Sequence, residues 1–337
     1  LNNGTTPTGL TGITVNGGDP TSSGDTLVVN DLAGGNTVTI ATTTNTITGA
    51  EPVPVVYGTI EAISLTTSVA GAEVAFTGSA NYTVNPGAET DEGTILTDAD
   101  PAVSFFGYGL GETIDFTAAI ANVTVNGTDN NDAFTVAANN DVTITGRATI
   151  ENIAGSTVTA NAGQGADTFT VDGGNLLATL NVNGGAGDDD DLLDANAPAG
   201  NVTVDLQLQR VTGFGATINY TGLQTVDVDA AGNLLTINAT GGDDTVEVTP
   251  LTSSTGVLRA NGADPVVLYN ATTDALTVAL QDGQDTLVVY GNETNETITV
   301  SGTAVVASGQ TVNFNTAEAL TVNGQQGSDI FNVTPGT

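Results

Sequence analysis

Aspartates are the residues of this sequence best suited to chemistry, and they gather in glycine-rich turns. The densest group is the run 188–191 with Asp194 behind it, which places five carboxylates within seven residues. Calcium is bound by about six to eight oxygen atoms from carboxylates, carbonyls and water, so such turns predict a structural calcium ion. The candidate ligands are Asp129, Asp132, Asp167, Asp188, Asp189, Asp190, Asp191, Asp194, Asp243, Asp244, Asp282, Asp285 and Asp329.

A structural role for the same aspartates is the alternative. Asp and Asn side chains readily accept hydrogen bonds from the backbone N–H groups of their own turn. In one copy of the recurring turn described below, the neutral Asn233 takes the place of the acid, which suits capping. Both interpretations therefore stand: calcium at one turn or more, and capping at the isolated turns.

Missing residue types exclude most other chemistry. The 337 residues include 38 acidic and 3 basic side chains, for a formal charge of −35, and no Cys, His or Lys. Thiolate and imidazole catalysis and zinc binding are thereby excluded. Three arginines are too few to neutralise nucleic-acid phosphates. Polysaccharide lyases also rely on basic groups, and Arg147, Arg210 and Arg259 are isolated, so we predict no enzymatic activity.

Membrane insertion is not expected either, because no apolar run approaches the length of a membrane span. An anionic membrane surface would also repel so acidic a chain. The chain opens at Leu1 rather than Met, which predicts a processed mature form or a piece of something longer.

A turn that ends in an acid recurs along the chain, with Asn six residues before Asp. The pairs are Asn126/Asp132, Asn161/Asp167, Asn183/Asp189, Asn238/Asp244 and Asn323/Asp329. Each copy predicts a strand, a turn, the acid and a second strand. Alternate copies are preceded by an aromatic residue and then an acid or amide, as in Tyr57/Glu61, Tyr220/Gln224 and Phe314/Glu318. Six repeat units follow, with the second the most divergent: 1–73, 74–122, 123–177, 178–233, 234–290 and 291–337.

These repeats predict an all-β repeat protein. β-Branched residues favour strands, Gly and Asn favour turns, and aromatic residues make up only 4 % of the chain, too few for a conventional sandwich core. Short strands and turns at a fixed period indicate a parallel β-solenoid whose neighbouring repeats stack. The alternative is a string of antiparallel β-sandwich domains, each made of two units.

The turns resemble the glycine- and aspartate-rich nonapeptide of secreted repeats-in-toxin proteins, G-G-x-G-x-D-x-U-x. The segment AGQGADTFT (162–170) departs from it only at Ala162, and GGAGDDDDL (184–192) has Asp191 at the apolar position. FNTAEALTVNGQQGSDIFNV (314–333) is similar to longer repeats in very large secreted proteins of planctomycetes and cyanobacteria. The resemblance implies an exported, calcium-associated β-solenoid surface or matrix protein. Toxin-type turns follow in immediate tandem and share each calcium ion, whereas the copies here are further apart.

Asn-x-Thr sequons form a second set of candidate sites and predict N-glycosylation of exposed turns. A repeat that places Asn and Thr at fixed positions would also generate them, so both origins stay open. The eleven candidates are Asn3, Asn81, Asn122, Asn126, Asn201, Asn219, Asn238, Asn270, Asn292, Asn295 and Asn332.

These features predict an extracellular structural protein at the cell surface, the subunit of a non-covalent fibre, sheath or surface layer. Residues 10–18 already belong to a repeat and 329–337 stop where another turn is due, so both ends resemble uncapped interior rungs. We therefore expect head-to-tail assembly of copies of the chain. The alternative is a calcium-dependent adhesin or passenger module that binds glycans or surfaces.

Overall fold

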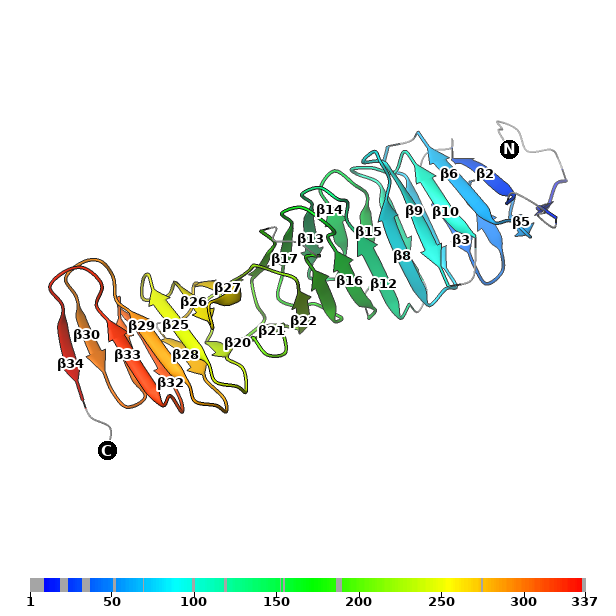
Figure 1. Ribbon diagram of the computed structural model, residues 1–337. Coiled ribbons are helices and arrows are strands. Elements are labelled where there is room, and N and C mark those ends of the chain that lie inside the picture. Colours follow the sequence, from blue (N-terminus) through cyan, green and yellow to red (C-terminus); the bar gives the residue numbers. More distant parts are fainter. Residues whose placement is uncertain are drawn as a thin grey trace. The chain divides into compact units, whose positions relative to one another are not determined.

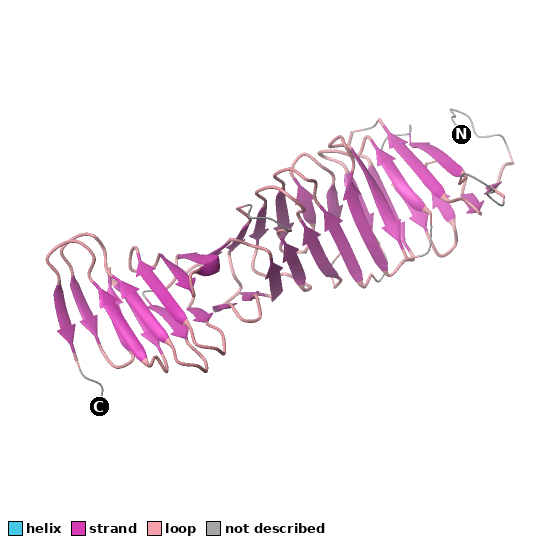
Figure 2. Ribbon diagram, in the orientation of Figure 1, coloured by secondary structure: helices cyan, strands magenta, loops and turns pink. Residues whose placement is uncertain are grey.

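The computed structural model describes residues 9–18, 24–31, 37–50, 53–68, 70–98, 101–117, 120–151, 153, 155–185, 190–273 and 275–334. Every regular element in these ranges is a β-strand (Figures 1 and 2). None of the described residues lies in a helix able to cross a membrane. The chain divides into two compact units, Leu1–Gly163 and Gln164–Thr337. The predicted all-β repeat fold is confirmed.

Two sheets form the first unit. In spatial order the first sheet holds β1 (Ile13–Asn16), β5 (Val55–Gly58), β4 (Thr46–Thr48), β3 (Val38–Ala41), β7 (Glu73–Thr77), β11 (Thr113–Phe116), β15 (Thr149–Glu151), β14 (Val142–Ile144) and β13 (Ala133–Ala137). The second sheet holds β2 (Thr26–Asp31), β6 (Ala62–Thr67), β10 (Ala102–Phe106), β9 (Glu92–Thr97), β8 (Asn81–Pro86), β12 (Asn122–Asn126) and β16 (Thr157–Asn161).

The second unit is built in the same way. Its first sheet holds β17 (Thr168–Asp172), β19 (Leu192–Asn196), β23 (Thr225–Asp229), β27 (Ala263–Asn270), β26 (Gly256–Ala260), β25 (Thr245–Pro250), β29 (Thr286–Tyr290) and β33 (Ala319–Asn323). Its second sheet holds β18 (Leu180–Asn183), β22 (Ala216–Thr221), β21 (Arg210–Phe214), β20 (Val202–Asp205), β24 (Leu235–Asn238), β28 (Ala275–Ala279), β32 (Gln310–Phe314), β31 (Ala304–Ala307), β30 (Thr297–Val300) and β34 (Ile330–Val333).

Three-stranded antiparallel meanders interrupt these otherwise parallel sheets. In β3–β4–β5 the chain steps back through adjacent strands until β5 pairs with β1, and β7 then resumes beside β3. The same reversal occurs in β8–β9–β10 and β13–β14–β15, and in the second unit in β20–β21–β22, β25–β26–β27 and β30–β31–β32. A solenoid of plain rungs, as the sequence suggested, lacks these reversals.

The core lies between the two sheets of each unit and consists of thin layers of Val, Ile, Leu and Ala. Strands show the two-residue alternation of a sheet with one buried face, as in β6 with Ile63 and Leu65 buried. In the first unit the Tyr82 ring on β8 lies 4.4 Å from the Phe116 ring on β11, centroid to centroid, and 6.0 Å from Phe76 on β7. These edge-to-face and tilted ring contacts join the two sheets of the first unit.

Two kinds of turn connect the strands. The hairpin turns inside the meanders use left-handed dipeptides, such as Asn261-Gly262 with φ of 57° and 64° and Ser308-Gly309 with φ of 51° and 81°. Asn-Gly at 126–127 and 323–324 lies instead in crossover turns, where the chain passes from one sheet to the other.

Candidate functional site

The recurring acids lie at the ends of the crossover turns. Turns 127–132, 239–244, 280–285, 291–296 and 324–329 each leave a strand of one sheet and end in an acid directly before a strand of the other. We call these segments the acid turns. The predicted order of strand, turn, acid and strand is therefore the local structure at these places.

Some acids cap their own turn. Asp132 Oδ2 accepts the backbone N–H of Thr128 at 2.6 Å and the Thr128 hydroxyl at 2.9 Å. Asp244 Oδ2 accepts the N–H of Thr240 at 2.8 Å, and its Oδ1 accepts the side-chain amide of Asn261 at 2.6 Å. Both carboxylates thus meet backbone donors in the way that the capping alternative requires.

The acids also cap one another's backbone across neighbouring strands. The N–H of Asp244 donates to Asp285 Oδ1 at 2.9 Å, and the N–H of Asp285 donates to Glu318 Oε2 at 2.7 Å. The N–H of Glu296 donates to Asp329 Oδ1 at 3.1 Å. Parallel strand pairing places the two acids of each pair side by side, because the residue after the first acid is aligned with the residue after the second. We call this arrangement the carboxylate ladder.

Two further stretches of the ladder follow the same rule. The N–H of Asp167 donates to Asp191 Oδ1 at 2.8 Å, and the N–H of Asp191 donates to Gln224 Oε1 at 2.8 Å. In the first unit the N–H of Asp25 donates to Glu61 Oε2 at 2.6 Å. In each of these pairs, the side chain of the residue before the later strand accepts a hydrogen bond from the backbone N–H of the residue before the earlier strand.

The ladder position in the aspartate run is Asp191. Asp188 and Asp189 lie outside the described residues. The six-residue spacing pointed to Asp189, but this turn is two residues longer than the others, so the acid before β19 is Asp191. Leu193 then takes the buried apolar position two residues later.

Glycine is required where the acid folds over its turn. A Cβ added to Gly127 would lie 2.5 Å from the Ala162 carbonyl oxygen and 2.7 Å from Asp132 Oδ2. One added to Gly184 would lie 2.5 Å from Asp191 Oδ2. These approaches are too close for a side chain, so the Asn-Gly pairs of the acid turns serve close packing.

The ladder acids Asp167, Asp191, Asp244 and Asp285 are 0–3 % exposed. Backbone N–H groups donate to the carboxylates of Asp191, Asp244 and Asp285. No group of three or more acidic side chains within the described part of the chain could hold a metal ion. Among the described ladder residues, Asp285 Oδ2 is buried and has no hydrogen-bond partner.

The remaining candidate ligands lie apart from the ladder. Asp129, Asp190, Asp243 and Asp282 are exposed on the turns. Of these, Asp243 accepts the N–H of Gln284 through Oδ1 at 2.9 Å.

Like charges meet on the outer faces of the sheets. Asp194 on β19 lies directly beside Asp227 on β23. Burial, and then Asp194, raise the pKa of the half-buried Asp227 above its ordinary value. In the first unit, burial and then Asp141, Asp115 and Glu73 raise the pKa of Glu151. These carboxylates oppose folding when charged.

Several sequon asparagines form hydrogen-bonded columns. Asn126 accepts the side-chain amide of Asn161 at 2.8 Å and donates its own to Asn85 at 2.6 Å. Asn122 donates to Asn81 at 2.6 Å, and Asn219 donates to Asn181 at 2.9 Å.

The other sequons vary in exposure. Asn201, Asn295 and Asn332 are exposed, whereas Asn238, Asn270 and Asn292 are half-buried. Asn292 Nδ2 donates to Ser308 at 3.4 Å, and Asn270 Nδ2 donates to Asp227 at 3.5 Å. Asn3 lies outside the described residues. Glycosylation stays a prediction, and the exposed sequon asparagines are Asn81, Asn122, Asn201, Asn295 and Asn332.

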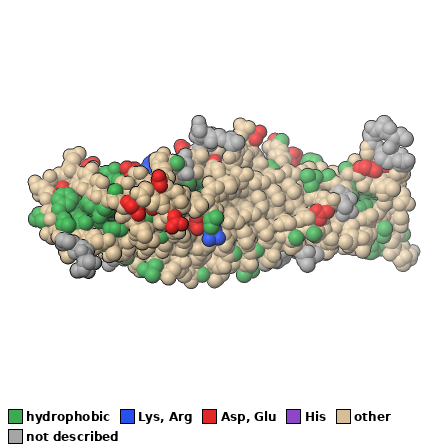
Figure 3. All heavy atoms as spheres, turned by 60° about the horizontal axis from the view of Figure 1, so that its bottom comes forward, with side chains coloured by type: hydrophobic (Ala, Val, Ile, Leu, Met, Phe, Trp, Pro, Cys, Tyr) green, Lys and Arg blue, Asp and Glu red, His purple; other side chains and the backbone are tan. Residues whose placement is uncertain are grey.

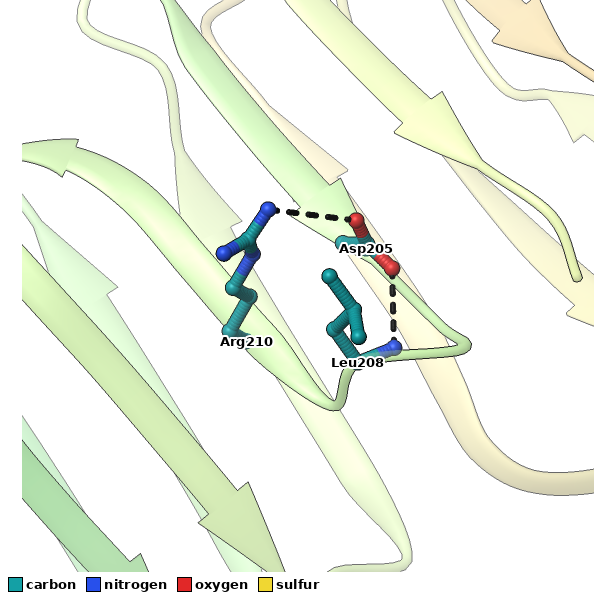
Figure 4. Close-up of polar contacts among 3 residues, drawn as sticks. All are labelled: Asp205, Leu208 and Arg210. Atoms are coloured by element: carbon teal, nitrogen blue, oxygen red, sulfur yellow. Dashed lines mark hydrogen bonds and ion pairs between the residues drawn. The ribbon is translucent and has the colours of Figure 1, made fainter.

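Arginines are used structurally at two turns. Arg147 donates to the carbonyl oxygens of Gly87, Glu89 and Glu92 at 3.0–3.3 Å and so caps the β8–β9 turn. Arg210 lies 3.7 Å from Asp205, whose other oxygen accepts the N–H of Leu208 (Figure 4).

Sequence reasoning used Glu61, Gln224 and Glu318 only as markers of the repeat. They are members of the ladder, and the signal for that role was their fixed spacing after an aromatic residue. No family model, curated protein or solved structure matches this chain.

Proposed function

We propose that this protein is an extracellular structural subunit that assembles head to tail, without covalent links, into a fibre, sheath or surface layer. The supporting observation is the surface of its last described rung, β33 with β34. Ile330, Phe331 and Val333 on β34 are 59 %, 46 % and 66 % exposed. Figure 3 shows hydrophobic side chains gathered at this end of the second unit.

The aligned residues of the inner rungs are covered by a following rung, whereas those of the last described rung are not. Ile298 on β30 is aligned with Phe331 and is fully buried, as is Leu287 on the inner strand β29. Fully burying an aliphatic or aromatic side chain contributes about 1.5–3 kcal/mol. The last rung therefore offers a surface that another rung would cover favourably.

The strand edges support the same proposal. Among the described residues β33 pairs only with β29, and β34 only with β30. An uncovered edge presents backbone groups in register for another strand. Placement outside the cell follows from the resemblance to secreted repeat proteins.

The test is sedimentation velocity and electron microscopy of the untagged chain over a concentration series. We expect filaments above a critical concentration, and Phe331→Ser should raise that concentration because it removes exposed apolar surface from the last rung. Leu251→Ser is the matched control, since Leu251 is 60 % exposed on a turn elsewhere in the second unit. A chain that stays monomeric throughout would refute the proposal and favour the adhesin module.

A further inference from the structure

The carboxylate ladder has a direction, and its two ends are complementary. Glu61 on the later strand caps the N–H of Asp25, and Asp329 caps the N–H of Glu296. The N–H of Asp329 has no hydrogen-bond partner among the described residues. Likewise, the carboxylate of Asp25 accepts no hydrogen bond from the described part of the chain. One end thus offers a donor, and the other an acceptor, at the same place in the repeat.

The first and last described rungs also match in sequence and pattern. Residues 13–17 read ITVNG and residues 320–324 read LTVNG. Ile13 and Val15 align with buried residues of β5, and Leu320 and Val322 with buried residues of β29. Both strands therefore turn the same alternate residues toward the core.

Internal pairs fix the register that such rungs adopt. Residues that directly precede the crossover turns lie opposite one another, as Asn126 opposite Asn161 and Tyr290 opposite Asn323. The residues that follow the ladder acids are likewise aligned. A rung added after β33 and β34 should obey both rules.

We infer that β33 and β34 dock the β1–β2 rung of a second copy of this chain, in parallel, with Asn16 opposite Asn323 and Asp25 opposite Asp329. The Asp25 carboxylate of the second copy accepts the N–H of Asp329, which continues the ladder between copies. This inference rests on the proposed function and specifies its contact.

The side-chain pattern agrees with this register. It places Phe331 opposite Leu27 and Val333 opposite Val29. Leu27 and Val29 are the buried residues of β2, so all four side chains face the core of the joined sheets. A shift by one residue would turn them to the outer face.

Cysteine cross-linking tests the register, because the chain has no cysteine of its own. Chains carrying Thr14→Cys are mixed with chains carrying Thr321→Cys, oxidised, and analysed on a non-reducing gel. Both threonines are exposed, and the register places them opposite each other. We expect at least about tenfold more mixed dimer than with Ala319→Cys or Asn323→Cys, which shift the thiol by about 7 Å along the strand.

Asp25→Ala tests the capping contact. Losing a hydrogen bond to a carboxylate should raise the critical concentration for assembly about tenfold or more. The thermal melt should not change, because the Asp25 carboxylate has no acceptor role among the described residues. Asp282→Ala removes the same charge from an exposed turn and serves as the control.

The possible failures are distinguishable. Filaments with no preference for the Thr14–Thr321 pair, or with equal effects of the two aspartate variants, would overturn this register and leave the proposed function standing. Absence of any self-association would overturn the proposed function itself.

Discussion

Asp285→Ala should open the acid turn 239–244 locally. Asp285 is 1 % exposed, and its Oδ1 accepts the N–H of Asp244 at 2.9 Å. Alanine removes that acceptor and leaves a buried donor unpaired. A hydrogen bond to a charged group contributes about 1.5–3 kcal/mol. At about 1.4 kcal/mol per tenfold change, the Asp244 amide should exchange with solvent about 10- to 150-fold faster.

Native-state hydrogen exchange of the peptide that contains Asp244 is the appropriate assay. It reports local opening, which remains interpretable in a repeat protein that need not unfold in one step. Asp285→Asn keeps an oxygen acceptor and removes the charge, so we expect less than about a tenfold change. Asp282→Ala, which removes an exposed acid from the neighbouring turn, should leave the exchange unchanged.

An equal effect of Asp285→Asn and Asp285→Ala would refute the reasoning, because the charge rather than the acceptor would then be decisive. Repeating the assay in millimolar calcium and in chelator sharpens the test. Protection by calcium that is present in the natural chain and lost in Asp285→Asn would identify a calcium ligand. Equal exchange in both buffers is the result that capping requires.

Three further substitutions have defined outcomes. Asp227→Asn should stabilise the protein at pH 7 by about 0.5–1 kcal/mol in a denaturant titration, because burial and Asp194 raise the pKa of Asp227. Since the protonated form is favoured in the fold, the gain should vanish below the ordinary Asp pKa of about 3.9 and appear as pH rises through the raised value. Gly127→Ala should cost about 1–3 kcal/mol in the same titration, because its Cβ would meet a backbone oxygen at 2.5 Å, whereas Gly200→Ala, in open space, should be neutral. Arg147→Met should speed proteolysis at the β8–β9 turn by losing the carbonyl caps, and unchanged cleavage would contradict that role.

The sequence was sufficient for the parts of the fold that depend on neighbouring residues. The spacing from Asn126 to Asp132 identified a crossover turn, and β-branched residues on either side identified its strands. The capping role of Asp132 was a stated alternative, and its contact with Thr128, four residues away, is local.

Meanders and the ladder could not be predicted, because they depend on contacts between distant segments. β3 pairs with β4 on one side and with β7 on the other, and β5 pairs with β1, so this arrangement depends on segments that are far apart in the sequence. Glu318 reaches the N–H of Asp285 across 33 residues of sequence, and only the strand register brings them together. The six-residue spacing pointed to Asp189 instead of Asp191 as the acid before β19, because the turn 184–191 is two residues longer than the other acid turns.

The meander imposes an order of assembly on the chain as it is made. β3 emerges before β4 and β5, yet β4 and β5 separate it from β1 in the finished sheet. The first strand of a meander therefore cannot take its final place alone, because the two strands that follow it must fill the gap behind it. We expect each meander to form as one cooperative step, so that folding advances past it by three strands at once.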